Sequence, residues 1–251
     1  MVDLEFDTDL DTGLAVLTID RPHARNAISL ETMDQLEKAL DAAAGARALV
    51  IKGAGERAFV SGGDLKELSV LRTEEDAAAM AKRMRSICDH LAAFPAPVIA
   101  ALNGHAFGGG AEVAVAADIR IAADDIKIAF NQVELEIMPA WGGAERLAAI
   151  VGKGRALLLA GAGTTLDAAE AERIGLVDLV LPRSSFEEGW RSAAISLARH
   201  PATEIKRVIS GVSPDEAIAS FARLWVADAH WRAAERVMNR TSTPRRSAEG
   251  D

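Results

Sequence analysis

The sequence predicts an α/β fold, in which short strands alternate with helices and the later part of the chain is mostly helical. Three observations support this prediction: aliphatic runs that recur along the chain, capped amphipathic segments between them, and glycine clusters that follow two of the runs. With 251 residues and a hydrophobic content of 49%, the chain is long enough for one large domain or for a core with a small appendage.

The aliphatic runs mark the expected strands. Each run is short, rich in Val, Ile, Leu and Ala, and bounded by polar residues or glycine, which is typical of buried strands. The runs cover residues 14–19, 48–51, 98–102, 119–122, 127–130 and 176–181.

Two segments of the first half carry helix-start signals. Ser29 is a candidate N-cap for a helix that runs to about Ala44. Thr73 is followed by three acidic residues, and it begins a longer helix that stops before Pro95.

A third helix start lies at Ser213 and Pro214, and we expect this helix to run to about Asn239. One face of it is apolar and wide, and it could pack on the chain's own core or on a partner subunit. This face includes Leu224, Ala227, Trp231, Ala234 and Met238.

Composition excludes several classes of function. The net charge of −9 argues against non-specific nucleic-acid binding, although a few basic side chains could still hold the phosphates of a small molecule. The five histidines are scattered and form no ligand motif, so we expect no metal site. No apolar run is long enough to span a membrane, the N-terminus lacks a secretory signal, and Cys88 is the only cysteine. We therefore expect a cytoplasmic protein without membrane contact, in which Cys88 is a buried structural thiol.

The first segment with chemical potential spans residues 58–65, after an expected strand and before an expected helix. Gly62 and Gly63 allow main-chain N–H groups to point into a cavity, and Asp64 suits a helix N-terminus. Taken alone, this segment is also explained as an ordinary strand-to-helix loop.

The second segment spans residues 103–112 and places three glycines at a helix start. Such a start exposes N–H groups that can bind an anion. A dinucleotide fingerprint counted from Gly108 requires Gly or Ala at position 113, which is Val113, and no P-loop lysine follows. Glu112, in the first helical turn, could be a catalytic acid or simply a charge that favours the helix dipole.

The third segment spans residues 130–143 and brings two carboxylates and an amide close together. If the backbone stays extended, Gln132, Glu134 and Glu136 lie on one side of it. A solvated strand edge is the simpler alternative.

Together these segments resemble the enoyl-CoA hydratase/isomerase (crotonase) family. The resemblance covers nearly the whole chain and depends on the order and spacing of several motifs. The motifs are Ile19–Pro22 with Asn26–Ala27, Phe59–Leu65, Asn103–Gly104, Gly108–Glu112, Asp118–Arg120, Gly142–Gly143 with Arg146–Leu147, and Ala168–Ala169 through Gly175–Val177.

This resemblance implies a spiral of ββα units over residues 1–184 and a C-terminal helical segment, residues 185–251, that assembles a homotrimer or a hexamer. It implies an acyl-CoA thioester substrate and no separate cofactor, since coenzyme A is part of the substrate. The N–H groups of Ser61 and Gly109 would form an oxyanion hole, and Glu112 matches the family's first acid/base glutamate. The CoA moiety would lie near Ala24, Arg25, Ser61, Gly62, Gly63, Asp64 and Gly109.

The sequence departs from a hydratase at the second catalytic glutamate, which falls on Gln132. An amide can neither activate water nor donate a proton to carbon. We hypothesise that Glu112 and Glu134 form the working pair in a hydratase-type lyase and that Gln132 orients water or substrate.

Three alternatives stay open. Residues 139–143 also resemble the ethylmalonyl/methylmalonyl-CoA decarboxylase branch, in which Glu134 matches a glutamate. Decarboxylation and double-bond isomerisation each need only one acid. A non-catalytic acyl-CoA-binding scaffold is the third alternative. The acyl chain is expected to depend on side chains of residues 66–94.

Overall fold

The computed structural model describes residues 1–6, 12–199 and 201–241. The chain forms two compact units, Met1–Thr203 and Glu204–Asp251. Among the described residues, no helix is both long enough and apolar enough to cross a membrane.

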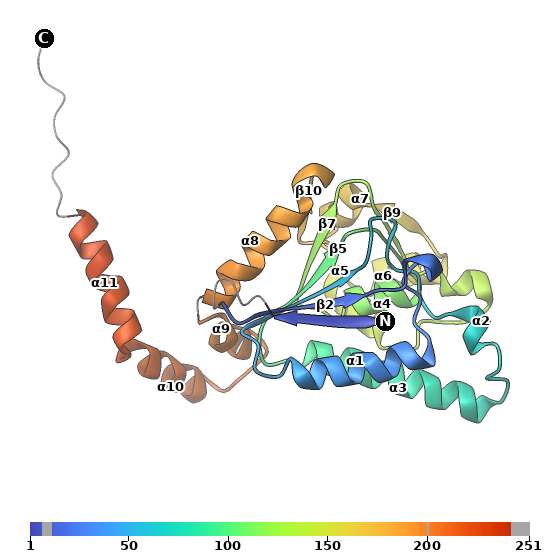
Figure 1. Ribbon diagram of the computed structural model, residues 1–251, viewed down its shortest axis with the longest axis horizontal. Coiled ribbons are helices and arrows are strands. Elements are labelled where there is room, and N and C mark those ends of the chain that lie inside the picture. Colours follow the sequence, from blue (N-terminus) through green and yellow to red (C-terminus); the bar gives the residue numbers. More distant parts are fainter. Residues whose placement is uncertain (7–11, 200, 242–251) are drawn as a thin grey trace, which may run out of the picture. The chain divides into compact units, whose positions relative to one another are not determined.

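The first unit contains two sheets. The larger has the strand order β1-β2-β3-β5-β7-β10, and the smaller has the order β4-β6-β8-β9 (Figure 1). The larger sheet consists of β1 (Val2–Phe6), β2 (Leu14–Ile19), β3 (Ala48–Gly53), β5 (Val98–Leu102), β7 (Ile119–Ala123) and β10 (Leu179–Leu181). The smaller consists of β4 (Ala58–Val60), β6 (His105–Phe107), β8 (Lys127–Ala129) and β9 (Thr165–Asp167).

Successive segments of the chain contribute one strand to each sheet and then a helix. β3 and β4 precede α2 and α3, β5 and β6 precede α4, and β7 and β8 precede η2 and α5. Within each sheet these strands pair in parallel, as expected when a helix follows each pair of strands. The predicted α/β spiral of ββα units is therefore confirmed.

The helices of this unit connect the strands, and some of them pack on the larger sheet. α1 and α3 contact each other, and α8 contacts β2, β3 and β7 (Figure 1). The helices are α1 (Leu30–Ala42), α2 (Leu65–Leu68), α3 (Glu74–Ala92), α4 (Gly109–Ala114), α5 (Gly143–Val151), α6 (Lys153–Gly161), α7 (Ala168–Arg173) and α8 (Phe186–Arg199), with 3-10 turns η1 (Pro22–Ala24), η2 (Asn131–Leu135) and η3 (Arg183–Ser185).

The predicted helix starts are confirmed by their caps. The side chain of Ser29 accepts a hydrogen bond from the N–H of Thr32, and that of Thr73 accepts one from the N–H of Asp76. Because each cap satisfies an N–H group that has no partner within the helix, these residues fix where the helices begin.

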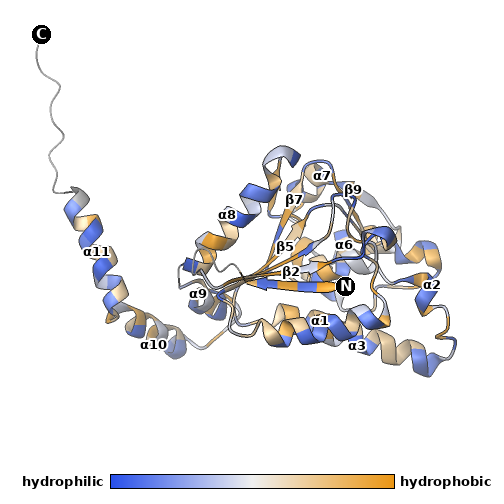
Figure 2. Ribbon diagram, viewed as in Figure 1, coloured by the Kyte–Doolittle hydropathy of each residue, from blue (hydrophilic) through white to orange (hydrophobic). Residues whose placement is uncertain are grey.

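The core lies between the central strands and the helices that cover them. β2, β3 and β5 are buried almost throughout, which is why their sequences are continuous aliphatic runs (Figure 2). The prediction for Cys88 is confirmed: it is fully buried, and burial raises the pKa of its thiol to about 12, so it stays protonated.

The boundary between the two units lies later in the chain than the 184/185 division that the sequence predicts. The reason is that α8 packs against three strands of the larger sheet and so belongs to the first unit. α9 (Ala202–Ile209) spans the boundary, and α10 (Pro214–Trp225) and α11 (Asp228–Thr241) follow in the second unit.

The single helix expected from Pro214 to about Asn239 is wrong, because the chain forms α10 and α11 instead. Val226 ends α10, and Asp228 stands in the first turn of α11, where a negative charge favours a new helix N-terminus. The start at Ser213 is confirmed, with a complete capping box that includes Glu216.

Candidate active site

Two main-chain bends meet at one end of the smaller sheet. β4 and β6 are parallel neighbours, so the loop 61–64 that follows β4 and the glycines that follow β6 emerge side by side. A Cβ atom placed on Gly62 would lie 3.3 Å from the main-chain nitrogen of Gly109. The structure therefore brings together the two loops that carry Ser61 and Gly109, as the sequence predicts.

The first bend is tied to the N-terminal part of the chain. The N–H of Ile28 donates to the carbonyl of Gly62 at 2.8 Å, and the N–H of Asp64 donates to the carbonyl of Ile28 at 2.8 Å. Asp64 also caps α2, where its carboxylate accepts from the N–H of Glu67. These contacts fix the loop between β4 and α2 from both ends.

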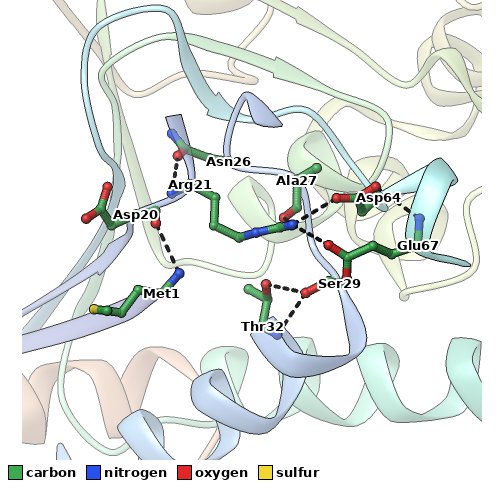
Figure 3. A network of polar contacts seen from close by, with 9 residues as sticks. All are labelled: Met1, Asp20, Arg21, Asn26, Ala27, Ser29, Thr32, Asp64 and Glu67. Atoms are coloured by element: carbon green, nitrogen blue, oxygen red, sulfur yellow. Dashed lines mark hydrogen bonds and ion pairs between the residues drawn. The ribbon is translucent and has the colours of Figure 1, made fainter. Parts of the chain in front are cut away.

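Arg21 adds a second set of contacts to this bend. Its guanidinium donates to Asp64 at 3.0 Å, to Glu67 at 2.6 Å and to the carbonyl of Ala27 at 2.6 Å (Figure 3). Partial burial raises the pKa of Asp64, but the N–H of Glu67 and the Arg21 guanidinium outweigh it and hold this pKa below its ordinary value. Asp64 is thus a charged anchor of the loop.

The second bend leads into α4. Gly108 has a φ of 54°, which favours glycine, and Gly109 is the first residue of the helix. The N–H groups of a first helical turn have no acceptor within the helix. The N–H of Gly109, as the first residue of α4, therefore has no acceptor within the helix.

Glu112 is buried in the first turn of α4 and accepts three hydrogen bonds. Its Oε2 accepts from the N–H of Trp141 at 2.7 Å and from the N–H of Gly143 at 2.9 Å, and its Oε1 accepts from Nε2 of Gln132 at 2.8 Å. Burial raises the pKa of Glu112 above its ordinary value of 4.5, although the three donors oppose this shift. A buried carboxylate with a raised pKa is suited to acid–base chemistry.

Gln132 lies directly beside Glu112 and is 7% exposed. Its Oε1 is buried and has no hydrogen-bond partner within the described part of the chain. A buried acceptor without a partner costs about 1–3 kcal/mol. The amide therefore offers an acceptor next to Glu112 for a donor that enters with a ligand.

Glu134 is exposed, and the donors to Glu112 are Gln132, Trp141 and Gly143 instead. Its Oε2 accepts from the side chain of Asn131 at 3.1 Å, and its Cγ lies 3.6 Å from the position of a Cβ on Gly163. The expectation that an extended backbone aligns Gln132, Glu134 and Glu136 is wrong, because η2 winds this segment into a 3-10 turn. With three residues per turn, side chains two positions apart point in different directions.

Trp141 is a member of this site that the sequence reasoning did not assign. It is 6% exposed, and its N–H holds Glu112. Its indole ring packs on Gly109, where a Cβ would lie only 2.1 Å from its Cζ3. The signal was an aromatic residue directly before two glycines, but only the fold shows which surface the ring covers.

A separate cavity of about 350 Å³ opens beside the first bend. Its walls include Ser61 and Arg25, which the sequence assigns to CoA binding, and Ala24 precedes Arg25 at the end of η1. Arginines outnumber carboxylates here, since Arg25, Arg57 and Arg183 stand against Glu56 and Asp125, and Arg183 pairs with Asp125. This surplus makes the cavity suitable for an anionic ligand.

Comparison with known proteins decides the family. The sequence profile of the enoyl-CoA hydratase/isomerase family matches residues 9–241, which is most of the chain. The chain belongs to the enoyl-CoA hydratase/isomerase family. It is an enzyme of this family, so the scaffold alternative is set aside.

Individual members of the family are similar in sequence and in fold. A "Probable enoyl-CoA hydratase" of Bacillus subtilis is 40% identical over 173 residues, which is 68% of this chain and 66% of that protein. A "Probable enoyl-CoA hydratase" of Mycobacterium bovis is 34% identical over 206 residues, 81% of this chain and 79% of that protein. The crystal structure of an enoyl-CoA hydratase from Bacillus anthracis superposes with a TM-score of 0.83 at 29% identity and covers 97% of both chains.

Gly143 gives a test of how Glu112 is held. A Cβ at this position would lie 2.3 Å from Cγ of Glu112, so we expect Gly143→Ala to lower the free energy of unfolding by about 1–3 kcal/mol. Gly154→Ala is the control, because its Cβ would meet nothing within 4 Å. Urea unfolding of both variants, of Glu112→Ala and of the double variant Gly143→Ala with Glu112→Ala measures this. Relative to Glu112→Ala, the added methyl group should cost less than it does in wild type, because only Cβ of residue 112 then remains close to it. Equal losses in the two glycine variants would contradict the packing.

The raised pKa of Glu112 predicts a pH-dependent cost to stability. Below pH 4.5 the carboxyl is protonated in the folded and in the unfolded chain, so wild type and Glu112→Gln should unfold alike. As the pH rises above 4.5, the unfolded chain ionises first, and wild type should lose stability relative to Glu112→Gln until the folded carboxyl also ionises. Urea unfolding from pH 4 to 8 at one protein concentration measures the difference. A gap that is independent of pH would contradict the raised pKa.

Proposed function

We propose that this enoyl-CoA hydratase-type enzyme adds water to a 2-enoyl-CoA, with Glu112 as the single carboxylate that serves as base and then as acid. The observation that carries the proposal is the pairing of Glu112 with Gln132, whose free Oε1 lies beside the carboxylate. The N–H groups of Ser61 and Gly109 hold the thioester oxygen in this proposal.

The reaction begins with the thioester bound across the two bends. Water adds its oxygen to C3 while Glu112 takes one of its protons, and the C2–C3 π electrons move toward the carbonyl, so that the negative charge reaches the thioester oxygen. The two N–H groups stabilise this enolate, and one such donor contributes about 3–4 kcal/mol to lowering the barrier. Protonated Glu112 then gives its proton to C2, which completes the 3-hydroxyacyl-CoA and restores the carboxylate.

Gln132 positions the water in this scheme. Its Nε2 is used by Glu112, and its Oε1 can accept one O–H of the water while the other O–H faces the carboxylate. The raised pKa of Glu112 brings the acid and base forms closer together in energy near neutral pH, which suits a group that must act in both forms.

The cavity beside Ser61 receives the CoA moiety. Arg25 is exposed at its rim and Arg57 lines it, so both can reach the phosphates of CoA although the chain has a net charge of −9. Ser61 lines this cavity and its neighbour Gly62 approaches Gly109, which supports a thioester position where the CoA path meets the two bends.

The assembly we propose is a homotrimer, alone or paired into a hexamer, in the cytoplasm. The second unit supports it, because α10 and α11 expose large apolar side chains that another copy would cover. These include Ile218, Phe221, Trp225, Val226 and Trp231.

Three variants test the roles of the polar side chains on crotonyl-CoA. Glu112→Gln should lower kcat on the order of 10²–10⁴-fold, because it removes the base and the acid. Gln132→Met, which keeps the volume but loses both the acceptor and the donor to Glu112, should lower kcat on the order of tenfold. Glu134→Gln is the matched control and should leave kcat unchanged, because Glu134 is exposed. Hydration is followed by the loss of absorbance of the conjugated thioester. Full activity of Glu112→Gln would show that Glu112 is not the acid and base. A large loss of kcat in Glu134→Gln would instead support Glu112 and Glu134 as the catalytic pair.

Decarboxylation of a malonyl-type CoA is the second candidate, and the amide of Gln132 favours it. Loss of CO2 from C2 gives the same enolate directly, and only one acid is then needed to protonate C2. Ethylmalonyl-CoA should yield butyryl-CoA, detected by mass spectrometry, and Gln132→Glu should suppress this product, because a second carboxylate would repel the substrate's own. Absence of butyryl-CoA with wild type would end this candidate.

A further inference from the structure

The side chain of Trp141 is tightly packed between the two bends. Its main-chain N–H donates to Glu112, and its ring packs on Gly109 so closely that a Cβ there would lie 2.1 to 2.7 Å from three ring carbons. Its Cζ2 is also 3.8 Å from the Cβ position of Gly63. One buried ring thus touches both bends and lies beside the carboxylate.

These three neighbours enclose the reacting part of the substrate, if the proposed function holds. With the thioester oxygen between Ser61 and Gly109, C2 and C3 must lie between the two bends and Glu112. In this proposed pose any further acyl carbons must pass the indole ring, because the ring packs on both bends. Leu68 of α2 packs on the first bend as well, since its Cδ1 is 2.9 Å from the Cβ position of Gly63.

The ring is also held in place. Gly142 follows Trp141 with a φ of 86°, the carbonyl of Trp141 accepts from Nη1 of Arg146 at 3.1 Å, and Arg146 pairs with Asp89 of α3. These contacts fix the main chain of Trp141, and the packing of its ring on Gly109 and Gly63 restricts rotation of the side chain. A ring with a fixed position limits the size of the acyl group that fits beside it.

We propose that Trp141 is a specificity-determining residue that restricts the acyl group to short chains, such as a four-carbon acyl group. This inference rests on the proposed function, from which it takes the position of the thioester. It places a determinant of chain length outside residues 66–94, the region in which the sequence locates such determinants.

Binding of saturated acyl-CoAs tests this without any chemical step. Dissociation constants for butyryl-, octanoyl- and lauroyl-CoA are measured by calorimetry for wild type, Trp141→Ala and Trp141→Phe. Leu157→Ala, which truncates an exposed side chain on α6, is the control. Circular dichroism checks folding, and Trp141→Phe keeps the test usable if Trp141→Ala does not fold, because it also removes part of the ring.

Wild type should bind butyryl-CoA at least about tenfold more tightly than octanoyl-CoA. Trp141→Ala should remove or reverse this preference, Trp141→Phe should weaken it, and Leu157→Ala should keep it. Equal affinities of wild type for the three ligands, or an unchanged preference in both Trp141 variants, would overturn the inference.

Turnover of crotonyl-CoA, measured in the same preparations, tests the proposed function separately from the role of Trp141. Chain-length-dependent binding that follows Trp141, without hydration or decarboxylation, would support the inference and refute the proposed function. Hydration together with a chain-length preference that is unchanged in both Trp141 variants would support the proposed function and refute the inference. If wild type binds none of the three ligands, both fail.

Discussion

The site depends on the close contact between two main-chain bends, one after β4 and one after β6. Parallel pairing of these strands brings their C-terminal ends out side by side, and the absence of side chains at Gly62 and Gly109 lets the bends approach closely. A side chain on Gly109 would collide with Trp141. The distance between the two bends is therefore set by strand pairing and by the glycines, and the polar groups of the site are attached to these bends.

Burial gives Glu112 its chemical character. Removing a carboxylate from water is costly, and here the cost is offset by two main-chain N–H groups and one amide. The offset is incomplete, and so the pKa is raised. The same loop that supplies these N–H groups also carries the ring of Trp141, so the segment after Pro139 both holds the carboxylate and places the ring on Gly109.

Much of this arrangement could be predicted from the sequence. Caps at Ser29 and Thr73 and the aliphatic strands are local signals, and the family resemblance that the motifs carry implied the spiral fold. The positions of Ser61, Gly109 and Glu112 follow from motifs at the ends of strands. The adjacency of their bends required only that the two strands pair in parallel.

The remainder depended on backbone geometry that the sequence pattern does not reveal. Whether residues 131–135 are extended or wound into a 3-10 turn decides which of Gln132 and Glu134 is buried, and both conformations are compatible with the same residues. The place of Trp141 depends on contacts between segments about 30 residues apart, which no local pattern encodes. The break between α10 and α11 is set by a two-residue turn in a continuous apolar pattern.

The most direct test of the account is a crystal structure with butyryl-CoA bound. The account predicts the thioester oxygen at about 2.7–3.1 Å from the main-chain nitrogens of both Ser61 and Gly109, with C2 and C3 facing Glu112 and the acyl terminus against Trp141. A carbonyl that contacts neither nitrogen, or an acyl chain that leaves the site away from Glu112, would contradict it.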